Sequence, residues 1–231
     1  MSPTVSPALA TIVFVGTHAL MSHPLRAGLV AWLGDRGFTL LYSLVALATF
    51  AWMIIAFRAG SDSVIFWIAP LWWWPIASAI MLIASILLAG GLVGNPAFPR
   101  PGAKPKPIPG PRGIYAITRH PMNMSFMLWA LVHASLAGSP RNLIVAAGIM
   151  ALALFGSMGQ ERKKARLLGP IWLDWQARTS FVPFGALLSG RARWRDAMPG
   201  AVALIGGLVF WALATSWHAP LVSPLGDLLS R

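Results

Sequence analysis

Cysteine is absent from this chain of 231 residues, which excludes disulfides, thiolate metal ligands and a cysteine nucleophile. Acidic residues are scarce as well, with six Asp and Glu in all, so a metal cage built from several carboxylates is also excluded. The glycine-rich, P-loop, Gly-x-Ser-x-Gly and His-Glu-x-x-His patterns of nucleotide-binding proteins, hydrolases and zinc enzymes are missing too. Any bound metal must therefore rely on His, Met, an isolated carboxylate or backbone oxygen.

Charged residues are also scarce: only 10% of the residues are charged, whereas 57% are apolar. A soluble domain of this size cannot bury so much apolar material, so a lipid bilayer is the expected solvent. Helices satisfy every backbone polar group inside lipid, and about 20 helical residues cross a core of roughly 30 Å. The sequence therefore predicts an all-α, polytopic membrane helical bundle that forms a single domain over residues 1–231. Its six transmembrane helices are expected near 6–22, 38–57, 70–92, 122–138, 142–158 and 199–218.

The 18 Lys and Arg residues, which give a formal net charge of +12, lie in the connections between these runs. Fifteen of them fall in the first, third and fifth connections, and the other three are Arg58, Arg141 and Arg231. Because positively charged connections stay in the cytoplasm, we expect a multi-pass protein of the inner (plasma) membrane with both termini on the non-cytoplasmic side. This distribution favours contacts with membrane lipids and argues against nucleic acid as a partner.

The third connection contains seven prolines between Gly94 and Pro111. Proline fixes its own backbone angle and cannot donate to a helix. We expect an extended, semi-rigid strap across the membrane surface here.

His133 lies well inside the fourth apolar run. An ionisable residue in a membrane span is a candidate for function by default. It shares a helical face with Met122, Phe126 and Trp129, which precede it by eleven, seven and four residues. An apolar aromatic face with one imidazole is what a haem pocket needs. The alternative is a buried histidine that is hydrogen-bonded to a carbonyl or a water.

The other histidines lie near the ends of the runs. His18 is a candidate for function or for snorkelling at the membrane boundary. His23 and His120 each precede a proline and could simply end or start a helix, and His218 is expected to be a solvated outer cap. Together with Asn123, the Arg119-His120-Pro121 entry could instead hold an anionic group at a helix N-terminus. His120 and His133 are separated by roughly 20 Å of helix, so they cannot share one small site.

The central motif is GIYAITRHPMNMSFMLWALVHASLAGS, which starts at Gly113. It is preceded by HALMSHPLR from His18 and followed by GPIWLDW from Gly169 and TSFVPF, which ends at Phe184. This pattern resembles the NnrU family over residues 6–184. The family is similar to the ζ-carotene isomerases of plants and cyanobacteria, which are integral membrane proteins with haem b.

The resemblance implies isomerisation of a cis double bond in an apolar polyene, or a link to nitrite and nitric oxide respiration (denitrification). It implies that haem b is the cofactor, with His133 as iron ligand, His18 as the second ligand and His120 as a supporting residue of the catalytic site. The absence of cysteine excludes the thiolate ligation found in the isomerase type. His18 and His133 differ in expected depth by roughly 10 Å, so a site with His133 alone is the simpler form.

Two further hypotheses remain open at this point. The Arg119-His120-Pro121 entry, with Glu161, also resembles membrane methyltransferases of the isoprenylcysteine type, which use S-adenosylmethionine. Met122 and Asn123 stand where those enzymes carry an aromatic residue. The third hypothesis is a non-enzymatic accessory or assembly factor whose basic connections dock protein partners or anionic lipids.

Overall fold

The computed structural model describes residues 4–62, 64–98 and 107–216, so His218 lies outside the described part. Within that part the secondary structure is helical apart from one isolated β-bridge, between Ile68 and Ala137. The helices are α1 (Val5–Ser22), α2 (Arg26–Ala59), α3 (Trp73–Gly91), α4 (Ile114–Ile117), α5 (Pro121–Leu136), α6 (Pro140–Leu168), α7 (Pro170–Arg178), α8 (Gly185–Leu188), the 3-10 helix η1 (Trp194–Asp196) and α9 (Ala201–Ser216).

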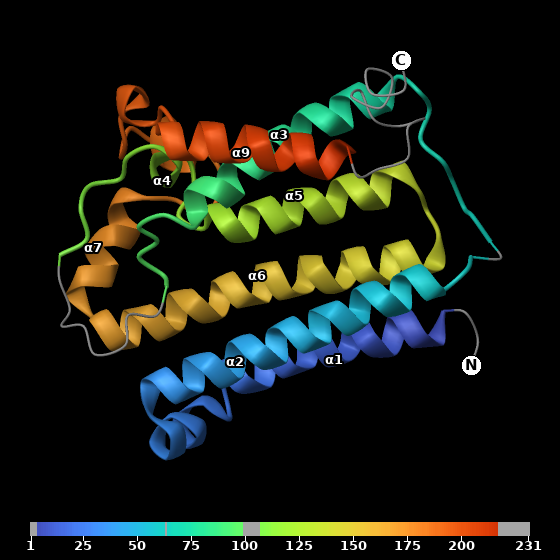
Figure 1. Ribbon diagram of the computed structural model, residues 1–231. Coiled ribbons are helices and arrows are strands. Elements are labelled where there is room, and N and C mark those ends of the chain that lie inside the picture. The colour runs from blue at the N-terminus through green and yellow to red at the C-terminus, as the bar shows by residue number, and fades with distance from the viewer. Residues whose placement is uncertain (1–3, 63, 99–106, 217–231) are drawn as a thin grey trace.

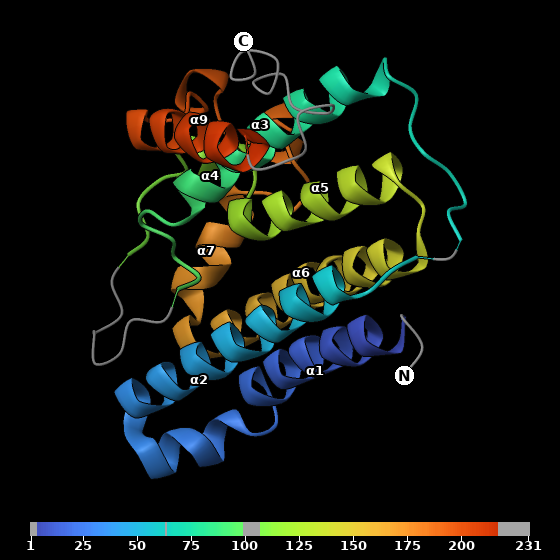
Figure 2. The same cartoon turned by 45° about the vertical axis from the view of Figure 1, so that its right-hand side comes forward.

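The long helices lie side by side as a bundle (Figures 1 and 2). Helix α9 packs on α3, α3 on α5 and α5 on α6; α6 then packs on α1, and α1 on α2. One apolar cluster fills the space among α3, α5, α6 and α9, and a second lies among α1, α2 and α6. The expected all-α membrane bundle is confirmed.

Each of the six expected apolar runs forms a helix, but the helices differ in length. Helices α1, α2, α3 and α6 are long and apolar enough to cross a membrane. Helices α5 and α9 have 16 residues each, which is about 24 Å against a core of roughly 30 Å. Four crossings are therefore supported by length and hydropathy, and the total of six stays a prediction.

Two helices extend beyond the apolar runs from which they were predicted. Helix α2 begins at Arg26 and is interrupted at Gly34, whose φ of 69° and ψ of 170° are not helical. Helix α6 continues to Leu168 through a charged stretch, Gln160 to Arg166. Glu, Arg, Lys and Gln are good helix formers, so loss of hydropathy marks where a helix leaves the membrane and not where it ends.

The two ends of the bundle differ in charge. The start of α1 and the end of α9 lie at one end, together with the α2–α3 and α5–α6 connections (Figure 1). The α1–α2 connection, α4 and α7 lie at the opposite end. That opposite end, called the basic end below, therefore gathers the connections rich in Lys and Arg, and the other is called the far end.

The proline-rich connection lies at the basic end. Its described residues, 94–98 and 107–111, are free of helix, as expected, and the stretch between them lies outside the described residues. Asn95 forms the turn that leaves α3, because its side-chain oxygen accepts a hydrogen bond from the Ala97 N–H at 2.9 Å.

Candidate functional site

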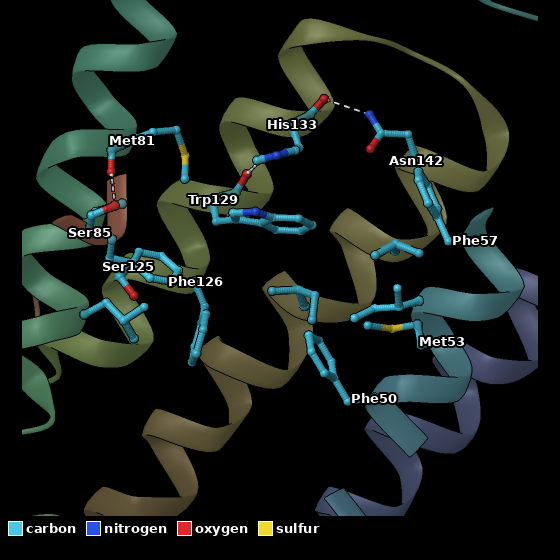
Figure 3. A pocket seen from close by; sticks show the side chains of 16 residues that line it. Phe50, Met53, Phe57, Met81, Ser85, Ser125, Phe126, Trp129, His133 and Asn142 are labelled. Carbon is cyan, nitrogen blue, oxygen red and sulfur yellow. Dashed lines mark hydrogen bonds between the residues drawn. The ribbon is translucent and has the colours of Figure 1, made fainter. Parts of the chain in front are cut away.

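A groove of about 450 Å³ opens among α2, α3, α5, α6 and α9 (Figure 3). We call it the apolar groove, because aliphatic, aromatic and Met side chains form most of its wall. Its lining residues are Phe50, Met53, Ile54, Phe57, Met81, Ala84, Ser85, Leu88, Ser125, Phe126, Trp129, His133, Asn142, Val145, Ile149 and Phe210.

Helix α5 supplies the aromatic and imidazole face of the apolar groove. Phe126, Trp129 and His133 are spaced by three and four residues, so they project from one side of the helix. Figure 3 shows Trp129 and His133 facing Met53 and Phe57 of α2 across the groove. The sequence predicted this face of α5, and the structure places α2 opposite to it.

The His133 ring is held by its own helix. Its Nδ1 atom lies 2.9 Å from the Trp129 carbonyl oxygen, and its ring stacks on Trp129 with centroids 4.1 Å apart. A carbonyl only accepts, so Nδ1 carries a proton, and in the neutral ring the lone pair is then on Nε2. Metal-binding histidines are commonly oriented by such a bond from the other ring nitrogen.

The remaining polar side chains of the groove bond to backbone carbonyls. Ser85 donates to Met81 at 2.8 Å and Ser125 to Met122 at 2.7 Å. Asn142 donates to two carbonyls, His133 at 2.7 Å and Ala137 at 2.6 Å. Because these donors are engaged with the backbone, the groove wall is effectively apolar.

The groove also reaches the outside of the bundle. Phe50, Ile54, Phe126 and Phe210 line it and are exposed on the bundle surface. In a membrane protein that surface faces lipid. An apolar molecule dissolved in the bilayer can therefore reach the groove from the side.

Met122 was expected on the face of His133, and Asn123 was expected beside Arg119 and His120; neither lines the groove. Met122 packs against Gly91 of α3, where a Cβ atom would come within 2.8 Å of the Met122 nitrogen. Asn123 is buried and donates to Ser157 of α6 at 2.7 Å. The structure therefore brings Phe126 and Trp129, but not Met122 or Asn123, to the groove with His133.

His18 lies between α1 and α2 and is not among the residues that line the groove. Its Nδ1 atom is 2.7 Å from the Phe14 carbonyl oxygen, and its ring contacts Phe14 and Tyr42. The structure does not bring His18 and His133 to one site. No group of three or more His, Asp and Glu side chains suited to a metal ion occurs among the described residues.

Arg119 and His120 belong to a different place, at the basic end. Glu161 of α6 accepts from Arg119 Nε at 2.5 Å and from His120 Nε2 at 2.6 Å. Its other oxygen accepts from Trp172 Nε1 at 3.3 Å and from the Gln176 amide, both on α7. We call these five residues the Glu161 cluster.

The Glu161 cluster lies beyond the apolar part of α6, outside the membrane-spanning segment expected at 142–158. Burial alone would raise the pKa of the Glu161 carboxyl. The hydrogen bond from His120, the Arg119 charge and the hydrogen bond from Gln176 outweigh burial and lower that pKa to about 2. Glu161 is therefore ionised at neutral pH and compensates the Arg119 charge.

The Glu161 cluster is directed into the protein. Arg119 Nη1 donates to the Gln176 carbonyl at 3.1 Å and to Thr179 Oγ1 at 3.0 Å, and the Arg119 N–H donates to Ser180 at 2.7 Å. The cluster therefore ties the start of α5 to α6 and α7. His120 is the N-cap of α5 and His133 is in its last turn, so the two occupy opposite ends of the helix, as expected.

A hydrogen-bonded group that the sequence did not reveal lies at the far end of the bundle, next to the groove residue Phe57. Arg141 bonds to Asp62 at 2.6 Å and to the Phe57 carbonyl at 2.8 Å. Gly138 and Trp67 pair through the backbone, because the Gly138 N–H donates to Trp67 at 2.9 Å. In the sequence, residues 138–140 predict a turn, but they do not show which other segment of the chain this turn contacts.

Comparison with known proteins now identifies the family. The model of the family described as NnrU protein matches residues 8–224. The chain belongs to the NnrU family. The match extends past Phe184, where the resemblance seen in the sequence ends, and includes α9.

Two curated relatives of this NnrU protein are chloroplastic 15-cis-zeta-carotene isomerases. That of Arabidopsis thaliana is 34% identical over 88 residues, which is 38% of this chain and 24% of the relative. That of Zea mays is 31% identical over 90 residues, 39% of this chain and 25% of the relative. The matched region therefore spans about a quarter of the length of each. No solved structure gives a significant match.

Proposed function

We propose that this NnrU protein binds an apolar polyene in the apolar groove and isomerises a cis double bond in it. The groove carries the proposal, because it is apolar, lies within the membrane bundle and is open to lipid. The similarity to two 15-cis-zeta-carotene isomerases supports the type of reaction.

His133 and its surroundings fit a haem group. The Nε2 atom would be the iron ligand, the bond from Nδ1 to Trp129 fixes the ring, and the aromatic walls suit a macrocycle. When bound, haem would supply a Lewis-acidic iron that polarises a double bond and so lowers its barrier to rotation. His18 is outside the groove, so the proposal uses His133 alone as protein ligand.

The side chains of the groove hold the substrate during the reaction. The faces of Phe126 and Trp129 on α5 and of Phe57 on α2 offer flat apolar surfaces for a conjugated chain. Isomerisation changes no atoms and needs no net proton transfer. The wall therefore has to exclude water and orient the polyene. Its polar side chains are bonded to backbone carbonyls, which suits that task.

Spectroscopy and turnover test this proposal separately. Purified from a haem-replete host, the protein is expected to show a Soret band and to convert 15-cis-ζ-carotene, as followed by chromatography. His133→Ala is expected to lower both by at least about tenfold. His18→Ala is the matched comparison, because His18 makes the same bond to a carbonyl four residues earlier, and it is expected to retain both signals.

The results decide between parts of the proposal. A wild-type protein without a Soret band would remove haem, and a band that survives in His133→Ala would remove His133 as ligand. A haem-loaded protein that leaves the polyene unchanged would remove the isomerase function.

Methyl transfer at the Glu161 cluster is the less favoured function. The charged groups of the cluster face one another, and Arg119 donates further hydrogen bonds to the Gln176 carbonyl of α7 and to Thr179 Oγ1. S-adenosylmethionine needs polar groups directed at the ligand.

The same proposal places the protein in the inner membrane as a multi-pass protein, with the basic end in the cytoplasm. If the protein has a role in nitrite or nitric oxide respiration, we expect nitric oxide to bind to the haem held by His133. A shift of the Soret band when nitric oxide is added would support that role, and an unchanged band would remove it.

A further inference from the structure

A second cavity, of about 510 Å³, lies at the basic end. The end of the proline-rich connection and the segment around η1 form its walls, and the Gly113 N–H joins them by donating to the Asp196 carbonyl at 2.7 Å. Arg112, Arg191 and Arg193 line the cavity, against one carboxylate, that of Asp196. We call it the arginine pocket.

The three arginines are held to different degrees. Arg191 is anchored, because it donates to Ser189 Oγ at 2.8 Å and to the Thr179 carbonyl at 3.0 Å. Arg193 pairs with Asp196 at 2.7 Å. Within the described part of the chain, Arg112 makes no side-chain hydrogen bond or ion pair. The pocket thus carries excess positive charge on a partly fixed frame, and guanidinium groups match phosphate in shape and charge.

Exposed apolar side chains lie on the same segment as Arg191 and Arg193 of the arginine pocket. Leu188, Trp194 and Met198 are 77%, 60% and 76% exposed, and Trp194 stacks with Phe184. The segment ends where α9 begins its apolar run. Exposed Trp and aliphatic residues beside arginines, at the boundary of a membrane helix, are typical of a surface that lies in the lipid headgroup region.

From these observations we propose that the arginine pocket binds the phosphate headgroup of an anionic phospholipid. The headgroup lies against Arg112, Arg191 and Arg193, and the acyl chains extend over Leu188, Trp194 and Met198. The apolar rim is what selects a lipid over a free phosphate ion. The site is independent of the apolar groove and of the reaction proposed there.

Binding to the full-length protein in a non-ionic detergent tests this site. Dihexanoyl phosphatidylglycerol, below its micelle concentration, is titrated beside inorganic phosphate and dihexanoyl phosphatidylcholine. The anionic lipid is expected to bind at least about tenfold more tightly than either comparison compound. Arg112→Gln and Arg193→Gln are each expected to weaken it by about tenfold. Arg36→Gln removes an exposed arginine from α2, outside the pocket, and is expected to stay within about twofold.

The contrary results are distinct. Inorganic phosphate that binds as tightly as the lipid would overturn the choice of ligand. Equal weakening by Arg36→Gln and Arg112→Gln would show that net charge alone attracts the lipid and would overturn the pocket. Circular dichroism of each variant establishes that it is folded, and Arg193→Gln gives an independent result if Arg112→Gln is not.

Discussion

Glu161 is one of six acidic residues in the chain, and it accepts hydrogen bonds from four side chains. Glu161→Gln removes the negative charge beside the largely buried Arg119 and is expected to lower the free energy of unfolding by about 2 to 3 kcal/mol. Asp174→Asn is the matched control, because the Asp174 pair with Arg178 is exposed, and it should cost less than about 1 kcal/mol. Denaturation in detergent, followed by circular dichroism, measures both. Equal losses would mean that the Glu161 cluster is no more important than a surface pair.

The same carboxyl gives a pH dependence. Its pKa is lowered from 4.5 to about 2, so the folded state favours the ionised form. The stability from this group is fully present above about pH 4.5 and is lost as the pH falls toward 2. The difference in stability between wild type and Glu161→Gln is therefore expected to shrink over that interval. A difference that is constant from pH 6 to pH 2.5 would contradict the assignment.

At the residue scale, helical periodicity predicts part of the groove. Phe126, Trp129 and His133 were found because they repeat along one side of a single helix. Met122 has the same periodicity but lies where α3 approaches α5 at Gly91, and that close contact fills the space. The opposite wall from α2 could not be predicted, because it depends on how distant helices pack.

Helices α9 and α3 pack closely where they meet at Gly207. A Cβ atom at Gly207 would lie 2.5 Å from the Ile86 Cα and 2.7 Å from the Ile86 nitrogen, both backbone atoms. Gly207→Ala is therefore expected to push the helices apart and to cost about 1 to 3 kcal/mol. Gly156→Ala on α6 meets nothing within 4 Å and should be neutral or stabilising by up to about 1 kcal/mol. Melting temperatures in detergent compare the two, and a neutral Gly207→Ala would contradict the close crossing.

At the element scale, hydropathy located all six long helices but not their ends. The charged extension of α6 and the first part of α2, before Gly34, are helical although they lie outside the expected apolar runs. The spatial order of the helices could not be predicted either, because every run has an apolar surface that could pack on several others. That order decides the fold, since α6 joins the group of α3, α5 and α9 to the pair of α1 and α2.

The whole molecule is polarised by charge, and the absence of cysteine makes the expected orientation easy to test. Ser61, in the α2–α3 connection, is exposed at the far end, and Ala177 on α7 is exposed at the basic end. In a cysteine-free chain, Ser61→Cys and Ala177→Cys each introduce a single thiol. Because connections rich in Lys and Arg stay in the cytoplasm, a membrane-impermeant maleimide is expected to label Ser61→Cys in intact cells with a permeabilised outer envelope. It should label Ala177→Cys only after the inner membrane is broken. The reverse pattern would invert the bundle, and the apolar groove, near the far end, would then lie closer to the cytoplasm.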